Sequence, residues 1–157
     1  MSYEKTEVPV VRSQDGIRKL VMAHNGFGIA FLTDRSQDPH EDWREGFQAK
    51  VIINKQPTVV QIMCKMKRPS PSGFYSDRQK ELFISQEERR VWRVLFWHLK
   101  SVFEASDSGV MEFRELMMPY IVMRDGKTVS EHLLPRLAAG LDPSRLLGDG
   151  SDCDSTG

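Results

Sequence analysis

The sequence predicts an α+β fold with a small antiparallel sheet, and three observations support this class. The chain of 157 residues is 39% hydrophobic and 28% charged, which is typical of one globular domain. Strand-like runs occupy much of its first half, while helical periodicity dominates its second half. Strands followed by helices within one domain are typical of α+β folds. We therefore expect β-α-β-β-β order, packed by a long helix and a C-terminal helical extension.

The N-terminal part of the chain predicts a strand, a helix and a second strand. Val8–Val11 is a short β-like run interrupted by a proline, which favours the edge of a sheet. Ser13 is a candidate cap for a helix that begins at Gln14 and ends at Asn25-Gly26, where left-handed residues are available. Phe27–Leu32 then predicts a strand.

A β-hairpin is expected after the polar loop 33–46. Its strands are Phe47–Ile53 and Thr58–Met66, and Asn54–Pro57 has suitable turn chemistry. Alternation in the second strand places four residues on one face, which are Val60, Ile62, Cys64 and Met66. The opposite face is mixed, and we expect it to contact solvent.

The best-marked element is a long helix from about Gln86 to Ser108. Ser85 and Glu88 match the S-x-x-E capping box at its start, and Ser108-Gly109 offers a stop. Its apolar residues form a broad stripe that should lie mostly in the core. A linker rich in Pro, Ser and Gly, Arg68–Tyr75, joins the sheet to this helix.

A C-terminal helical extension is expected to close the core. Met111–Met118 predicts a short helix, and Tyr120–Met123 a β-like run that enters a turn. Thr128 and Glu131 match a second capping box, which predicts a helix to about Ala139.

We expect one domain, residues 1–147, followed by a disordered acidic tail, 148–157. No apolar stretch approaches the roughly 20 residues of a membrane span, and the N-terminus lacks the apolar core of a signal peptide. Cys64 and Cys153 make no framework of bridges, which favours a reducing compartment. The expected protein is therefore cytoplasmic and binds no membrane.

No sequence motif with a known catalytic mechanism is present. The 4 histidines lack the close spacing of metal ligands, and neither a phosphate-binding glycine loop nor a nucleophile elbow occurs. His98, on the apolar side of the long helix, fits a hydrogen-bonded core or interface histidine better than a catalytic base. We expect a non-enzymatic protein with no metal and no cofactor.

Positive charge is concentrated in the middle of the chain, although the formal net charge is +0. Cations on loops and at a helix start contact phosphates, and Phe74 and Tyr75, interleaved with them, could stack on bases. We interpret residues 65–93 as a site for DNA or RNA. Its candidate binding residues are Lys65, Lys67, Arg68, Arg78, Lys80, Arg89, Arg90 and Arg93. Because acidic residues share this segment, a solvated charged surface is the alternative.

Three aromatic residues widen the apolar stripe of the long helix to nearly its whole circumference. They are Trp92, Phe96 and Trp97. Such a helix is either buried on both sides or contacts a partner. These residues are therefore a candidate interface with another protein or with a second copy of the chain.

Several C-terminal motifs resemble a group of small uncharacterised proteins of bacteriophages, prophages and some bacteria. The motifs are Val91-Trp92-Arg93-Val94-Leu95, Lys100, Glu104, Met111-Glu112-Phe113, Pro119-Tyr120-Ile121-Val122, Asp125-Gly126-Lys127-Thr128-Val129 and Leu134-Pro135. The resemblance is looser in the first half and is lost in the polar loop around His40. It implies a compact phage-type accessory protein acting around DNA replication, recombination or host defence, and it supplies no catalytic residue.

Two functions remain open at this point. The preferred hypothesis is a non-enzymatic accessory protein that binds nucleic acid, or a nucleic-acid-processing partner, through residues 65–93. It would act in the cytoplasm of the host cell if a phage encodes it. The alternative is a protein-interaction or oligomeric assembly module, or an inhibitor of a host factor, that uses the aromatic long helix.

Overall fold

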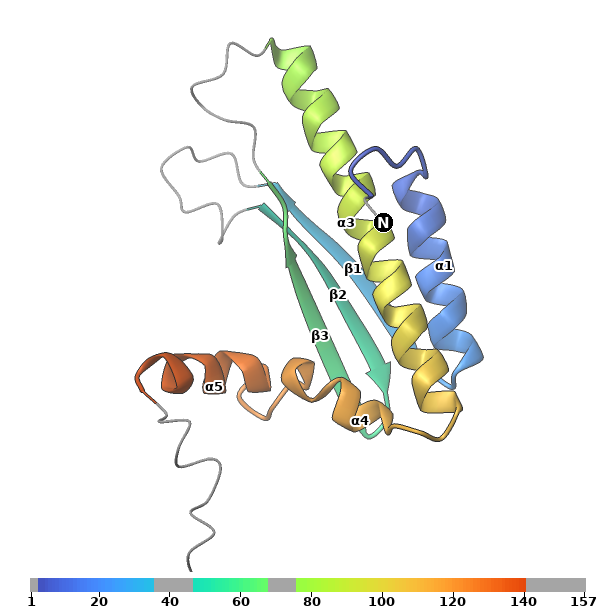
Figure 1. The fold of residues 1–157 in the computed structure, drawn as a ribbon, viewed down its shortest axis with the longest axis vertical. Coiled ribbons are helices and arrows are strands. Elements are labelled where there is room, and N and C mark those ends of the chain that lie inside the picture. Colours follow the sequence, from blue (N-terminus) through green and yellow to red (C-terminus); the bar gives the residue numbers. More distant parts are fainter. Residues whose placement is uncertain (1–2, 36–46, 68–75, 141–157) are drawn as a thin grey trace, which may run out of the picture.

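The computed structural model describes residues 3–35, 47–67 and 76–140, and it confirms the α+β class. A three-stranded antiparallel sheet is followed by helices, of which one is much longer than the others (Figure 1). In chain order the elements are α1 (Val10–Ala23), β1 (Gly28–Arg35), β2 (Phe47–Lys55), β3 (Thr58–Lys65), α3 (Asp77–Asp107), α4 (Phe113–Leu116), the 3-10 helix η1 (Met118–Tyr120) and α5 (Val129–Ala138).

The sheet has the order β1-β2-β3, so that the predicted hairpin forms its second and third strands. Ile53 pairs with Ile29 on one side and with Val60 on the other, which places these side chains on one face. The predicted alternation in β3 is confirmed, because Ile62 is buried while its neighbour Met63 is exposed. Register and burial therefore define one core face of the sheet.

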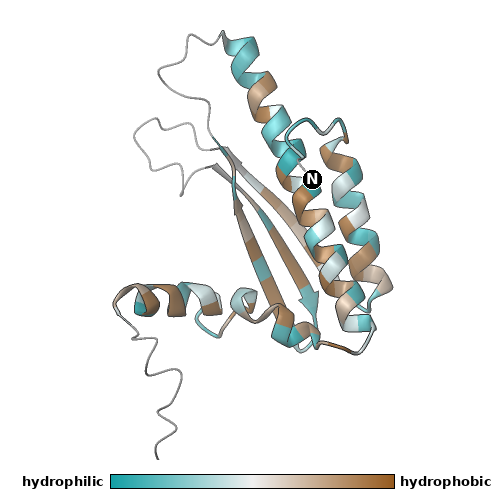
Figure 2. Ribbon diagram, viewed as in Figure 1, coloured by the Kyte–Doolittle hydropathy of each residue, from teal (hydrophilic) through white to brown (hydrophobic). Residues whose placement is uncertain are grey.

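Helices α1 and α3 pack side by side on this core face and run in the same direction (Figure 1). Ile17 and Val21 of α1 are buried, and Trp92 of α3 is fully buried with its ring edge-on to Phe31 of β1. The brown, hydrophobic segments of Figure 2 follow this contact between helices and sheet. The core is one layer between the sheet and the helix pair.

The predicted strand Val8–Val11 is wrong, because α1 begins at Val10 and Pro9 is its N-cap. Proline is compatible with a helix start because its missing N–H has no intrahelical acceptor there. Ser13 is not a cap either: it is buried within the helix. Val10 packs against the core on the same helix face as Ile17, a spacing that continues the amphipathic pattern backwards. The sheet consequently has three strands, and the chain order begins with a helix.

Helix α3 begins at Asp77, nine residues before the predicted start. Ser76 caps it: its hydroxyl accepts from the Gln79 N–H, and the Gln79 side chain accepts from the Ser76 N–H. Neither glycine nor proline lies between this cap and Ser85, so the helix runs through the second candidate cap. The predicted end is confirmed, with Ser108 as C-cap and Gly109 at φ 75°.

The C-terminal extension follows the prediction only in part. Phe113 of α4 and Met117 close the lower end of the core, and Ile121 forms an isolated bridge with Val60. The predicted capping box before α5 is confirmed by two hydrogen bonds between Thr128 and Glu131. Helix α5 itself does not close the core: it has no buried residue and projects away from the sheet (Figures 1 and 2).

Some predictions concern residues outside the described part of the chain. These are most of the polar loop 33–46, the linker Arg68–Tyr75 and the acidic tail. Among the described helices, none has the length and apolar character needed to cross a membrane.

Candidate functional site

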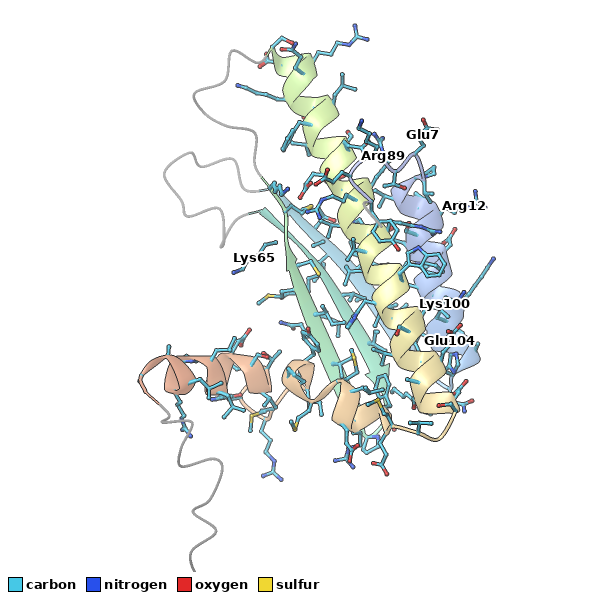
Figure 3. All side chains as sticks on the ribbon, in the orientation of Figure 1. Glu7, Arg12, Lys65, Arg89, Lys100 and Glu104 are labelled. Atoms are coloured by element: carbon cyan, nitrogen blue, oxygen red, sulfur yellow. The ribbon has the colours of Figure 1, made fainter. Side chains whose placement is uncertain are left out.

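Among the described residues, the basic side chains predicted to bind nucleic acid are spread along α3 and the end of β3. Arg78 and Lys80 are exposed in the first turn of α3, about 20 Å along the helix from Arg93 at a rise of about 1.5 Å per residue. Lys65 ends β3 on the side of the molecule opposite α1 (Figure 3). Lys67 is exposed just beyond β3, and Arg68 lies outside the described residues. These basic residues are therefore close in the sequence but not gathered at one place in the structure.

Arg90 is neutralised by a carboxylate of its own helix. The Glu87 carboxylate, with 7% of its side chain exposed, accepts from Arg90 Nε at 2.9 Å and from Arg90 Nη2. It also accepts from the backbone N–H of Lys67 at 2.9 Å, which joins the end of β3 to α3. Burial raises the pKa of Glu87, but the bonds and charges of Arg90 and Lys67 outweigh burial, so its pKa lies below the ordinary value. This geometry makes Arg90 a structural residue.

The side chain of Arg89 also has a hydrogen-bond partner, close to the N-terminal segment. Its Nη2 donates to Gln86 Oε1 at 2.6 Å, while the Gln86 amide donates to the carbonyls of Glu4 and Thr6 at 2.8 and 3.1 Å. These bonds hold residues before α1 across α3. We assign Arg89 a positioning role for this segment.

Arg93 differs from both, because aromatic rings hold it rather than a carboxylate or an amide oxygen. Its guanidinium carbon lies 4.8 Å from the Phe96 ring centroid and 5.2 Å from that of Trp97. On the following turn, Lys100 Nζ lies 4.9 Å from the Trp97 ring centroid. Cation–π contacts orient these groups without neutralising them. Arg93 therefore has no carboxylate partner among the described residues, and Lys100 has only the long pair with Glu104 described below.

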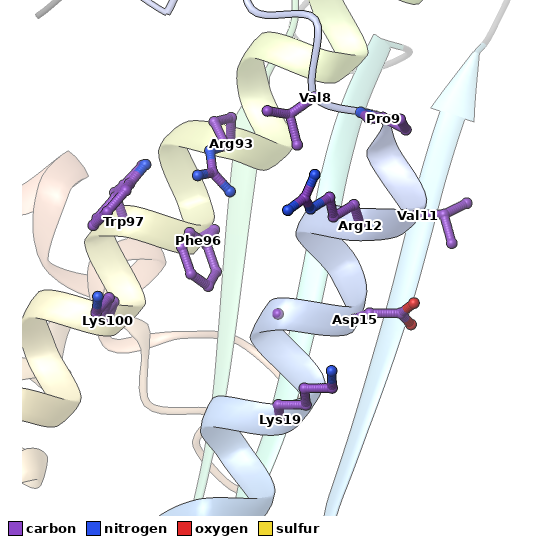
Figure 4. A pocket seen from close by; sticks show the side chains of 11 residues that line it. Val8, Pro9, Val11, Arg12, Asp15, Lys19, Arg93, Phe96, Trp97 and Lys100 are labelled. Atoms are coloured by element: carbon purple, nitrogen blue, oxygen red, sulfur yellow. The ribbon is translucent and has the colours of Figure 1, made fainter.

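A groove of about 770 Å³ lies between α1 and α3 and contains these cations (Figure 4). Arg93 and Lys100 line it from α3, and Arg12 and Lys19 line it from α1. The two cations of each helix are seven residues apart, which corresponds to two turns and about 10.5 Å. The remaining lining residues are Val8, Pro9, Val11, Asp15, Gly16, Phe96 and Trp97. The structure thus creates a basic groove that the sequence pattern did not predict.

The groove has an excess of positive charge. Figure 4 shows Arg12 reaching from α1 toward α3, while the Arg93 guanidinium lies over the Phe96 ring on the opposite wall. The one carboxylate in the lining, Asp15, points away in this view and pairs with Arg18 at 2.8 Å. Glu104 reaches Lys100 only at 3.9 Å and is 65% exposed, so solvent screens this pair strongly. An anion between the walls would be attracted by the cations of both helices.

Two of the three predicted interface residues lie in this groove. Trp92 is fully buried, so its assignment to a partner interface is wrong: the hydrophobic core uses its ring. Phe96 is half-buried beside Gly16, where a Cβ atom would come within 2.7 Å of the ring. Trp97 is 39% exposed. Phe96 and Trp97 therefore form an aromatic wall rather than an exposed apolar stripe.

A sequence signal for the missed residues existed. Arg12 and Lys19 share one face only if α1 includes Arg12, and the predicted helix began after it. Lys100 lies outside the segment 65–93. The sequence analysis counted charges along the chain. It could not predict the groove, because the groove forms only where residues of two separate helices pack together.

Other candidate chemistry finds little geometric support. Within the described ranges, no three His, Cys, Asp or Glu side chains are grouped to hold a metal ion. His98 is exposed, so it is not a core histidine, and its ring lies edge-on to Tyr120. No known family model, curated protein or solved structure matches the chain, so the resemblance to phage proteins stays a prediction.

Proposed function

We propose that the protein binds nucleic acid through the groove between α1 and α3. The observation that carries the proposal is the pair Arg12 and Arg93, which line the groove from opposite walls with no carboxylate paired to either in the described part of the chain. Lys19 and Lys100 extend the positive charge by two helical turns on each wall. A ligand with regularly spaced negative charges complements such paired rows.

The chemistry of Arg93 favours phosphate as the anion. A guanidinium held against aromatic rings keeps its N–H edge free for two parallel bonds to phosphate oxygens. Because its rotamer is already restricted by the rings, less entropy is lost when it binds. The phosphates of a nucleic-acid strand would therefore bind a guanidinium that is already oriented.

Fluorescence anisotropy with labelled DNA and RNA oligonucleotides over a salt series tests this proposal. Binding should weaken steeply as salt rises, and Arg12→Ala should reduce the slope of log K against log salt by roughly 0.7 to 0.9 for each phosphate that the variant no longer neutralises. Arg93→Lys retains the charge but not the fork, so it should weaken binding with little change of slope.

Arg78→Ala and Lys80→Ala are matched controls from the segment that the sequence favoured. If they reduce the slope while Arg12→Ala does not, the site lies at the start of α3 and the groove assignment is wrong. Absence of binding at low salt would refute nucleic-acid binding altogether. Competition by an acidic peptide as effective as unlabelled oligonucleotide would identify a protein ligand instead.

A second candidate function is association between two copies of the chain, and α5 favours it. None of its ten residues is buried, and Leu133, Leu134 and Leu137 are 42%, 61% and 48% exposed. So short a helix is marginal in water without packing. The outer sheet face also exposes Leu32 and Met63, so two copies could cover both surfaces reciprocally.

Light scattering tests this second candidate directly. The wild-type chain should have the mass of a dimer, and Leu134→Glu should convert it to a monomer that still binds oligonucleotide. A monomeric wild-type chain at high protein concentration would eliminate this candidate and leave the groove proposal untouched.

A further inference from the structure

The aromatic wall of the groove carries information about which nucleic acid fits. Phe96 and Trp97 lie with ring centroids 5.3 Å apart and planes at 71°, in an edge-on arrangement. Phe96 is packed toward α1 at Gly16, whereas Trp97 leaves 39% of its surface exposed beside the cations. Indole surface and phosphate-binding groups therefore share one groove.

Arg93 and Lys100 flank Trp97 by one turn on either side, and both lie over its ring. A base would therefore stack on the part of the indole surface that stays exposed, or would displace one of these cations from the ring. The phosphate and the base of one nucleotide are joined through a single sugar, so one strand can place a phosphate on a cation and a base on the neighbouring ring. Stacking of this kind tolerates any base because every base has a π face.

Base pairing prevents this arrangement. In a duplex each base is stacked on its neighbours and paired at its edge, so its face is closed to an indole unless the base leaves the helix. The groove is also narrow at its floor, where a Cβ on Gly16 of α1 would lie 2.7 Å from the Phe96 ring of α3. Unpaired nucleotides can contact both the aromatic rings and the cations of the groove. A duplex can contact the cations, but its paired bases cannot stack on Trp97.

We infer that the groove selects single-stranded nucleic acid by stacking an unpaired base on Trp97 while Arg93 and Lys100 hold the flanking phosphates. This inference rests on the proposed function and specifies its substrate class. Arg12 and Lys19, on the opposite wall, contact neighbouring phosphates of the same strand.

Three probes of different chemistry test the inference: single-stranded DNA, the matching duplex and inorganic polyphosphate. Wild-type protein should bind the single strand most tightly, and the single strand should quench tryptophan fluorescence. Trp97→Ala should weaken single-strand binding by about 5- to 150-fold, the effect expected for loss of one stacked base, with little change for polyphosphate or duplex. Trp97→Phe should recover part of the affinity while losing the quench.

The possible failures are distinguishable. Equal affinity of wild-type protein for single strand and duplex overturns the inference but leaves groove binding intact. A Trp97→Ala protein that binds the single strand normally, or that loses all three probes equally, also overturns it; the second outcome would show that Trp97 only positions the cations. A thermal melt of each variant establishes that the protein is folded. Wild-type protein that binds no nucleic acid refutes the proposed function itself.

Discussion

Replacing Glu87 by glutamine should destabilise the fold through Arg90. The Glu87 side chain is 7% exposed and accepts bonds from Arg90 and from the Lys67 backbone N–H, while the Arg90 side chain is 25% exposed. Glutamine keeps one acceptor but removes the negative charge bonded to Arg90, whose guanidinium is largely buried and keeps only the weaker attraction of Glu4. Breaking a buried pair costs about 3–5 kcal/mol, and partial hydration of Arg90 should lower the loss to about 2–4 kcal/mol of unfolding free energy.

Urea unfolding at neutral pH measures this loss. Glu81→Gln makes the same chemical change at an exposed position of α3 and should stay within about 0.5 kcal/mol of wild type. If Glu87→Gln is no less stable than this control, the reasoning about the buried pair is refuted. A change in the urea dependence itself would indicate an altered unfolded state rather than a broken pair.

The same pair predicts a pH dependence with a definite sign. The folded-state pKa of Glu87 is lowered, because the bonds and charges of Arg90 and Lys67 outweigh the effect of burial. Its contribution to stability is therefore fully present above the ordinary pKa of a glutamate, about 4.3, and is lost as pH falls through the lower folded value. The stability difference between wild type and Glu87→Gln should shrink in that acidic window, and a constant difference would contradict the assignment.

Three further changes test other parts of the fold. Trp92→Ala, at a fully buried position, should cost about 3–5 kcal/mol in urea unfolding, whereas Trp97→Ala should cost much less. Burial raises the pKa of Cys64 to about 11, so in a Cys153→Ser chain iodoacetamide should label Cys64 slowly at neutral pH until denaturant is added. Thr128→Ala removes the α5 cap and should lower the melting temperature by an amount equivalent to about 1 kcal/mol.

Elements with strong local signals could be predicted from the sequence. The hairpin of β2 and β3 follows from alternation around a turn, and the cap of α5 follows from Thr128 and Glu131. The start of α3 could not be chosen in the same way, because two caps of equal spacing, Ser76-x-x-Gln79 and Ser85-x-x-Glu88, compete. The cap at Ser76 forms because the residues between the two caps favour a helix. The capping pattern at Ser85 alone does not reveal this preference.

The candidate site was less predictable, because the role of a cation depends on what packs beside it. Arg90 and Glu87 lie three residues apart on one helix, and Arg93 and Trp97 lie four apart, so both contacts could be expected from the sequence. The approach of Arg12 to Arg93 could not be, since it arises from α1 packing parallel to α3. A basic segment was consequently predicted where the structure forms a basic groove.

The charge arrangement of this groove is itself an argument for a ligand. Arg12 and Arg93 carry like charges on the two walls, so their charges do not attract each other and do not help α1 to dock on α3. The contact between these helices is already provided by apolar groups such as Ile17 and Val21 of α1, which are fully buried. Sites built for binding commonly retain such arrangements because the ligand supplies the missing interactions. An anionic chain in the groove would be attracted by both walls, and so tie its own binding to the docking of α1.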